Sequence, residues 1–190
     1  MYLTKEEVKA IEEFNADGPL EKAKDLFLLG IYTGQRQSDW RKADWTRIKT
    51  IGSTKVLVIT QQKTAQIAAL PVSPKLEKLL HKYSGGWPSL SIQKLNRRIK
   101  ELCKKAGIDH TVTITEHRGG KATELTGKKY EFISSHTARR TFATNAILAG
   151  IPASEVMKFT GHRTLSAFMQ YIRTTAQEAA ILYAEHPFFS

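Results

Sequence analysis

Glycine and proline divide most of this chain into segments whose apolar residues recur at helical spacing, and this pattern limits the fold more than any other. Helices are predicted over residues 20–33, 92–106, 135–149 and 166–172, and others are predicted to begin at 4, 38, 74, 152 and 175. Thr4 and Glu7 have the spacing of a capping box, which supports the first start. Gly34 is expected to end the helix before it in the left-handed conformation.

Only short segments have strand character. Residues 55–60 are rich in β-branched side chains, and a polar turn over 61–66 separates them from a second strand predicted at 67–70. Another pair of strands is predicted at 112–115 and 130–133, around a basic hairpin tip that contains Arg118 and Lys121. We therefore predict an α+β fold, a mostly helical single domain with a small antiparallel sheet.

The charge of the chain indicates a polyanionic partner. It has 29 Lys and Arg residues against 18 Asp and Glu, a net charge of +11. Cys103 is the single cysteine, so no disulfide can form within the chain, and its place in a helical apolar pattern indicates a small core residue. No apolar run approaches the ~18 residues of a membrane span, and the first residues lack the apolar core of a signal peptide. We expect a cytoplasmic protein with no membrane partner.

The residues most informative about function are two histidines, two arginines and a tyrosine. Tyr171 follows His162 by nine positions, and His136 precedes Arg139 by three. Residues three apart on a helix share a face, so the side chains of His136 and Arg139 are expected to lie together. Arg140 points about 100° away from Arg139 and is the poorer candidate for the same site.

These residue types suit cleavage of a phosphodiester without a metal ion. The reaction needs a nucleophile, cationic donors for the non-bridging oxygens and an acid for the departing hydroxyl. Tyr171 can be the nucleophile, although a phenol with a pKa of about 10 needs surrounding cations to react at neutral pH. Arg36, just past a predicted helix end, and Arg139 can each give two parallel hydrogen bonds to a phosphate.

The ordered set resembles the tyrosine recombinases (phage-integrase family), from about residue 3 to the C-terminus. The matching residues stand in the family's order, and they are Arg36, Lys63, His136, Arg139, His162 and Tyr171. Flanking residues agree, with Thr-Gly before the first arginine, Ser-Asp after it and Leu-Ala-Gly after the His-x-x-Arg helix. The resemblance implies the tyrosine recombinase catalytic fold and no metal or other cofactor.

The resemblance also implies a role for each residue. Tyr171 would attack the scissile phosphate to give a 3′-phosphotyrosine, and Lys63 would protonate the leaving 5′-oxygen. His136 would assist proton transfer from the tyrosine, and His162 would hydrogen-bond a non-bridging oxygen. Asp39 stands where the family has a carboxylate that supports the first arginine.

Double-stranded DNA is the partner that the resemblance implies, and site-specific recombination, by integration or excision, is the implied function. DNA contacts are expected at four basic residues, Arg118, Lys121, Arg140 and Arg163. We expect a monomer that assembles into a homotetramer on DNA, with accessory DNA-bending or directionality factors as further candidates.

By this resemblance, we expect residues 1–190 to correspond to the catalytic domain alone, without the N-terminal core-binding or arm-binding domains of the family. We expect an excised fragment rather than an unusually short protein. Residues 175–190 form a candidate docking segment, which packs either on its own domain or, as the resemblance favours, on a neighbouring subunit.

Three other classes of protein are alternatives to a recombinase. Type IB topoisomerases share the chemistry, and these residues alone do not separate the two classes. A helix-turn-helix regulator fits the segment 136–157, but Val156 and Met157 give its second helix a core character, and Arg36 and Tyr171 would have no function. A histidine metalloenzyme is disfavoured, because no histidine pair has i, i+4 spacing and the chain has one cysteine.

Overall fold

The structure, a computed structural model, describes residues 1–118, 121–172, 180–181 and 184, and gives the backbone alone for 116–118 and 121–122. Its helices are α1 (Lys5–Glu13), α2 (Gly18–Thr33), α3 (Pro74–Lys82), α4 (Ile92–Lys105), α5 (Ser135–Leu148), α6 (Ala153–Thr160) and α7 (Leu165–Met169). Short 3₁₀ helices are η1 (Gln37–Lys42), η2 (Trp45–Arg47) and η3 (Lys129–Phe132). The strands are β1 (Ile48–Ile51), β2 (Thr54–Thr60), β3 (Ile67–Pro71), β4 (Thr111–Arg118) and β5 (Lys121–Lys128).

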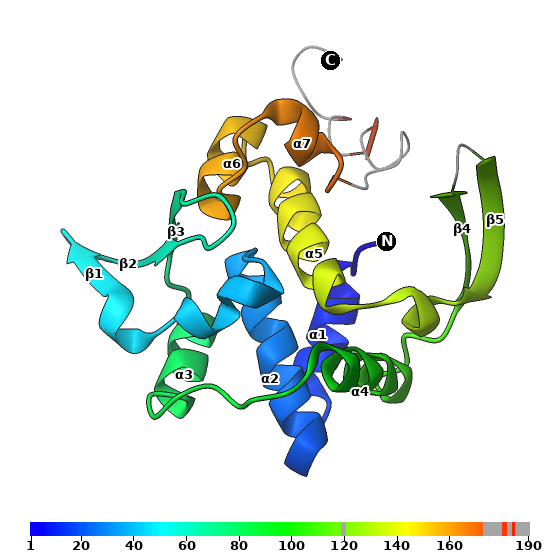
Figure 1. Ribbon diagram of the computed structural model, residues 1–190, viewed down its shortest axis with the longest axis horizontal. Helices are drawn as coiled ribbons and strands as arrows, with labels where there is room; N and C mark the ends of the chain where they lie inside the picture. Colours follow the sequence, from blue (N-terminus) through cyan, green and yellow to red (C-terminus); the bar gives the residue numbers. More distant parts are fainter. Residues whose placement is uncertain (119–120, 173–179, 182–183, 185–190) are drawn as a thin grey trace.

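The predicted α+β class is confirmed. Strands β1, β2 and β3 form one antiparallel sheet in that order, and β4 and β5 form a separate antiparallel hairpin. Figure 1 shows the sheet and the hairpin on opposite sides of a helical centre. Among the described residues, no helix has the length and apolar character needed to cross a membrane.

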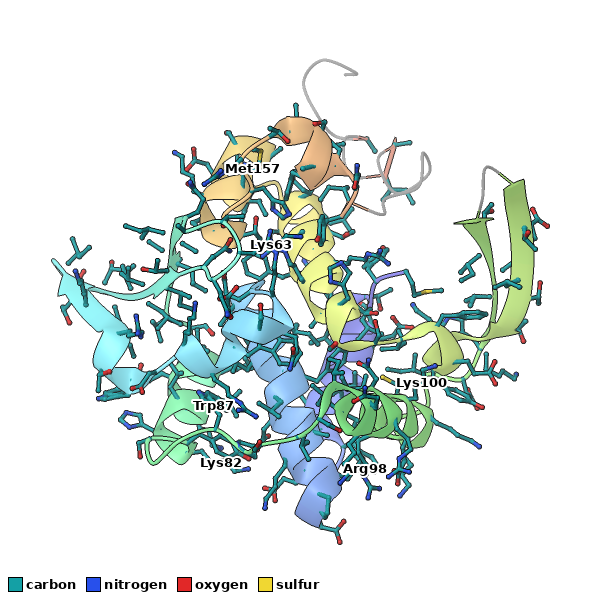
Figure 2. The ribbon with its side chains drawn as sticks, in the orientation of Figure 1. Lys63, Lys82, Trp87, Arg98, Lys100 and Met157 are labelled. Atoms are coloured by element: carbon teal, nitrogen blue, oxygen red, sulfur yellow. The ribbon has the colours of Figure 1, made fainter. Side chains whose placement is uncertain are left out.

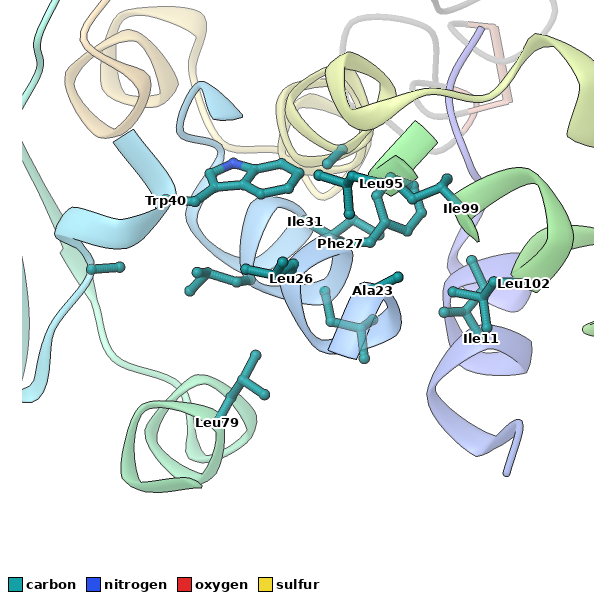
Figure 3. Close-up of a cluster of buried hydrophobic side chains, with 14 of the residues drawn as sticks. Ile11, Ala23, Leu26, Phe27, Ile31, Trp40, Leu79, Leu95, Ile99 and Leu102 are labelled. Atoms are coloured by element: carbon teal, nitrogen blue, oxygen red, sulfur yellow. The ribbon is translucent and has the colours of Figure 1, made fainter. Parts of the chain in front are cut away.

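Helix α2 is the centre of the core, because apolar residues occupy nearly all of its faces. Phe27 and Leu29 are fully buried, and Figure 3 shows side chains from α2, α3 and α4 meeting around this helix. Trp40 of η1 packs on the α2 backbone, where a Cβ added to Gly30 would lie 2.3 Å from the indole. This close contact fixes the segment that follows α2. Cys103 is buried in the same core, as predicted.

The β2–β3 hairpin carries a turn to the centre of the molecule. Leu57 and Ile59 of β2 are fully buried, and the pairing of Thr60 with Ile67 leaves residues 61–66 as the connecting turn. Both strands and the polar turn were predicted. Strand β1 was not predicted, and the reason is its exposure: only Ile48 of its four residues is partly buried, so no apolar alternation marks it.

The second hairpin corrects one prediction. Its strands pair Thr111 with Lys128 through to Arg118 with Lys121, so the basic tip is where it was expected. The prediction of a strand at 130–133 is wrong, because residues 129–132 form η3. Ile133 is fully buried, and the buried Lys129 places its Nζ 2.7 Å from a carboxylate oxygen of Glu7. This segment therefore packs on the core rather than in a sheet.

Helices α5, α6 and α7 enclose a smaller core of Ala143, Val156 and Phe168, against which Tyr171 packs. Helix α7 ends at Met169 rather than at 172, and the backbone N–H of Tyr171 bonds the carbonyl of Phe168 at 2.8 Å. The burial of Val156 disfavours the helix-turn-helix interpretation. The helix predicted to begin at 175 and the tail 175–190 lie outside the described residues, except for positions 180, 181 and 184.

Candidate active site

Arg139 lies at the centre of the candidate site, with 1% of its surface exposed. Helix α5 directs it toward the end of α2, where its Nη1 donates to the carbonyl of Gly34 at 2.8 Å. Gly34 ends α2 in the left-handed conformation with φ of 63°, as predicted. The other guanidinium nitrogen, Nη2, lies 3.0 Å from Nε2 of His162. Within the described part of the chain, no carboxylate pairs with Arg139. Its charge is therefore held by a carbonyl and an imidazole, which are neutral groups.

His162 is held between Arg139 and Thr160. Its Nδ1 lies 2.7 Å from Oγ1 of Thr160, and that hydroxyl donates to the carbonyl of Val156 at 2.8 Å. Because a guanidinium can only donate, Nε2 of His162 is the acceptor, and the proton of the neutral ring belongs on Nδ1. Gly161, which ends α6 with φ of 65°, places the imidazole at this point.

Both imidazoles are held in the neutral form. Burial, followed by the charges of Arg139 and Arg36, lowers the pKa of His162 to about 3. Burial and then the charges of Arg140 and Arg139 lower the pKa of His136. Burial, with the charge of Arg36 next, also lowers the pKa of Arg139 to about 10, which leaves it charged at neutral pH. A neutral imidazole can accept a proton, which a charged one cannot.

Tyr171 packs against all three of these side chains. Its ring centroid lies 4.7 Å from that of His162 and 5.1 Å from that of His136. The guanidinium carbon of Arg139 lies 5.3 Å from the same ring. The hydroxyl of Thr144 on α5 lies 3.4 Å from the carbonyl of Tyr171 and helps to hold the backbone there. The structure thus brings four of the six candidate residues into one cluster.

Arg36 reaches this cluster through a buried glutamine. Its Nη1 donates to Oε1 of Gln61 at 2.8 Å. The amide nitrogen of Gln61 in turn donates to Oε1 of Gln35 at 2.7 Å and to the carbonyl of Thr160 at 2.5 Å. Because Thr160 is also the partner of His162, Gln61 connects the first arginine with the loop that carries the histidine.

Lys63 is an exposed residue of the turn 61–66, and Figure 2 shows it near the inner end of the β2–β3 hairpin. Within the described residues its ammonium makes no hydrogen bond or ion pair. The predicted support of Arg36 by Asp39 is not direct. Oδ1 of Asp39 accepts from the backbone N–H of Gln62 at 2.8 Å and pairs with Nζ of Lys42 at 3.0 Å. The buried Asp39 carboxylate therefore holds the turn that carries Lys63.

The four basic residues predicted to contact DNA lie at separate places. Arg140 lines an open hollow with Lys100 and Asn96, between α4, α5 and β4. Arg163 is exposed, and its Nη2 donates to the carbonyl of Thr64 at 2.5 Å. Arg118 and Lys121 flank the tip of the β4–β5 hairpin, and their side chains lie outside the described part of the structure.

No cluster of three or more His, Cys, Asp or Glu residues in the described ranges is arranged to hold a metal ion.

The family model described as the phage integrase family matches residues 1–178. The chain belongs to the phage integrase family. Among curated proteins, none matches its sequence.

Solved structures of recombinases and integrases share the fold of this phage integrase family member. The XerH recombinase in a post-cleavage complex with its palindromic difH substrate is 15% identical with a TM-score of 0.67, covering 100% of this chain and 53% of that one. The XerA recombinase is 18% identical with a TM-score of 0.66, covering 98% of this chain and 64% of that one. The catalytic domain of bacteriophage HP1 integrase is 15% identical with a TM-score of 0.56, and the match covers 100% of this chain and 98% of that one. This chain spans just over half the length of XerH.

Sequence reasoning missed Gln61, Gln35 and Thr160, which connect the candidate residues. One signal for Gln61 was available. The inward positions of β2 are Leu57 and Ile59, and the alternation places Gln61 at the next inward position. A polar residue at a core-facing position needs hydrogen-bond partners, and it was therefore a candidate for the site.

Proposed function

We propose that this chain is the catalytic domain of a tyrosine site-specific recombinase, which cleaves and rejoins DNA through a 3′-phosphotyrosine without a metal ion. The observation that carries the proposal is the cluster around Tyr171. A phenol, two neutral imidazoles and the buried guanidinium of Arg139, which has no carboxylate partner in the described residues, lie in contact. Such a cluster combines a nucleophile, two groups that can transfer a proton and a cation that can stabilise a phosphate.

In the proposed reaction, the hydroxyl oxygen of Tyr171 attacks the scissile phosphorus and the bond from phosphorus to the 5′-oxygen breaks. The phenolic proton passes to the neutral His136, whose lowered pKa keeps it able to accept one. Arg36 and Arg139 bind the non-bridging oxygens, where negative charge develops. A phosphate anion beside His162 would raise the pKa of its imidazole and favour the protonated ring, which can donate a hydrogen bond to a non-bridging oxygen.

Lys63 supplies the proton that the leaving 5′-oxygen needs. Its ammonium makes no bond within the described residues, so it can turn toward DNA without breaking one. A 5′-hydroxyl from a second duplex then attacks the phosphotyrosine, which restores Tyr171 and joins the two strands. The energy of the original phosphodiester is kept in the covalent intermediate, so no nucleotide is consumed.

The proposed partner is double-stranded DNA, and Arg118, Lys121 and Arg140 are proposed to contact it. A net charge of +11 supports a polyanionic partner. One structural neighbour is a lambda integrase tetramer bound to a Holliday junction, with a TM-score of 0.55. We extend a tetrameric assembly on DNA to this chain, with the tail 175–190 as the segment that docks on a neighbouring subunit. Accessory DNA-bending or directionality factors remain part of the proposal.

The test is covalent capture on nicked suicide DNA taken from the flanks of the encoding gene, in buffer with a chelator. The short fragment that carries the released 5′-hydroxyl diffuses away after cleavage, so it cannot reverse the reaction. The covalent adduct therefore accumulates and is detected on a denaturing gel. Tyr171→Phe should lose the adduct and keep DNA binding, because only the nucleophilic oxygen is removed. An adduct that persists in Tyr171→Phe would contradict the assignment.

Adding a second duplex with a free 5′-hydroxyl separates recombination from topoisomerase-like cleavage. A recombinase should transfer the captured strand to the new duplex when both duplexes carry the target site. Relaxation of supercoiled DNA without transfer would favour the topoisomerase-like alternative.

A further inference from the structure

The turn that carries Lys63 is tied to the molecule at positions on both sides of this lysine. On one side, the backbone N–H of Gln62 bonds Asp39, and the side chain of Gln61 is buried among Arg36, Gln35 and the carbonyl of Thr160. On the other side, the hydroxyl of Thr64 donates to Oε1 of Gln61 at 2.9 Å. Lys63 is thus the residue between two anchored positions.

The backbone of the turn is strained at the next residue. Ala65 has φ of 53°, in the left-handed region, and its N–H bonds the carbonyl of Gln61 at 3.0 Å. A residue other than glycine in this region costs free energy and persists only where surrounding contacts hold it. The contacts on Thr64, which directly precedes Ala65, are therefore placed to keep the strained turn in one conformation.

Arg163 supplies such a contact. It lies in the loop after α6, next to His162, and its Nη2 donates to the carbonyl of Thr64 across 99 positions of sequence. The same loop contacts the turn at a second point, where a Cβ added to Gly161 would lie 2.6 Å from the amide carbon of Gln61. The histidine loop and the lysine turn are therefore joined at two places, one on each side of Lys63.

We propose that Arg163 and Gln61 are positioning residues that clamp the turn 61–66 to the loop 161–163, so that Lys63 is presented beside His162 and Tyr171. This inference rests on the proposed function, because it takes Lys63 as the proton donor. It assigns Arg163 to the protein's own backbone rather than to a DNA phosphate. Neither residue touches the reacting atoms in this role.

The first experiment compares two leaving groups. Single-turnover adduct formation is measured on nicked DNA with a normal scissile phosphodiester, and on the same DNA with sulfur in place of the bridging 5′-oxygen. A thiolate leaves without a proton, because thiols ionise far more readily than alcohols. Loss of the proton donor therefore slows cleavage of the oxygen substrate and leaves the sulfur substrate almost unaffected.

Arg163→Ala should slow the oxygen substrate roughly fivefold to tenfold, the effect of one lost hydrogen bond on the turn's equilibrium, and leave the sulfur substrate within about twofold of wild type. Lys63→Ala should show the same pattern with a larger loss, about 100-fold or more. Gln61→Met should be rescued by sulfur only in part, because it also removes the acceptor of Arg36. Lys158→Ala is the matched control, since Lys158 is an exposed cation on α6 that pairs with Glu155, and it should change neither rate.

Equal slowing of both substrates by Arg163→Ala, together with a salt dependence of DNA binding reduced by about 0.9 in log–log slope, would mean that Arg163 binds a phosphate. That result would overturn the clamp. An unchanged rate on both substrates would overturn it as well.

A second measurement is independent of activity. Hydrogen exchange at the amides of Gln61 and Ala65, which close the turn, should be faster in Arg163→Ala than in wild type, while exchange at Leu57 in β2 should not change. Unchanged exchange at the turn would refute the clamp even if the enzyme cleaves DNA. If exchange at the turn is faster in Arg163→Ala but even the wild-type protein forms no adduct on either substrate, the clamp is supported and the proposed function is contradicted.

Discussion

At the scale of single residues, the candidate site holds more positive charge than its neighbours compensate. Arg139 is almost fully buried, and among the described residues its side chain hydrogen-bonds a carbonyl and a neutral imidazole. A buried charge without a counter-ion lowers stability, so such an arrangement is retained where an anion completes it. The lowered pKa of His162 is a consequence of the same field, because burial and two arginines oppose a further positive charge.

This field predicts a pH dependence of folding. The pKa of His162 is about 3 in the folded chain and about 6.5 in the unfolded one. Below pH 6.5 the unfolded chain binds a proton that the folded chain rejects, so stability falls as the pH is lowered toward 3. Between pH 7 and pH 5 the loss from this group is up to about 2 kcal/mol. Urea unfolding at both pH values should show a smaller difference for His162→Gln than for wild type. Equal differences in the two proteins would argue against a strongly lowered pKa.

At the scale of secondary-structure elements, the site depends on how the ends of α2, α6 and the β2–β3 hairpin meet. Gly161 is the contact between α6 and the hairpin, and it has φ of 65°. Gly150 at the end of α5 has φ of 83° but has no atom near a hypothetical Cβ. The two glycines therefore share one backbone requirement and differ in packing.

Substitution of the two glycines by alanine separates these effects. Gly150→Ala should lower the free energy of unfolding by about 1 kcal/mol, the cost of a left-handed alanine. Gly161→Ala should lower the free energy of unfolding by more, because its Cβ would displace the buried Gln61. The same variant should slow adduct formation at least tenfold. Urea unfolding and single-turnover cleavage measure the two quantities. Equal losses in both variants would show that the contact with Gln61 has no importance for the site.

The sequence predicted the helical elements well because their apolar spacing and end signals are local. The capping box of Thr4 and Glu7 and the left-handed Gly34 are both present. The aromatic segment 130–133 was mistaken for a strand, since burial on the core and burial in a sheet favour the same residue types. The Gln61 network could not be predicted in full, because its contacts join positions 26 and 99 residues apart.

At the scale of the whole molecule, the tail 175–190 is proposed to dock on a neighbouring subunit, while the candidate catalytic residues all precede it. We therefore expect DNA binding and subunit assembly to be separable. Removal of residues from 175 onward should spare binding to a single DNA site and impair synapsis and recombination. Sedimentation of the complexes on DNA gives the stoichiometry. A truncated protein that still forms tetramers and recombines at the rate of the intact chain would refute docking on a neighbouring subunit.

The central claim is that Tyr171 becomes covalently joined to a 3′-phosphate, and mass spectrometry of the captured adduct tests it most directly. After nuclease and trypsin digestion, the peptide of residues 164–173 should carry a nucleotide attached through a phosphotyrosine. The DNA fragment released in the same reaction should bear a free 5′-hydroxyl. Attachment at another peptide, or a released fragment with a 5′-phosphate, would contradict the account.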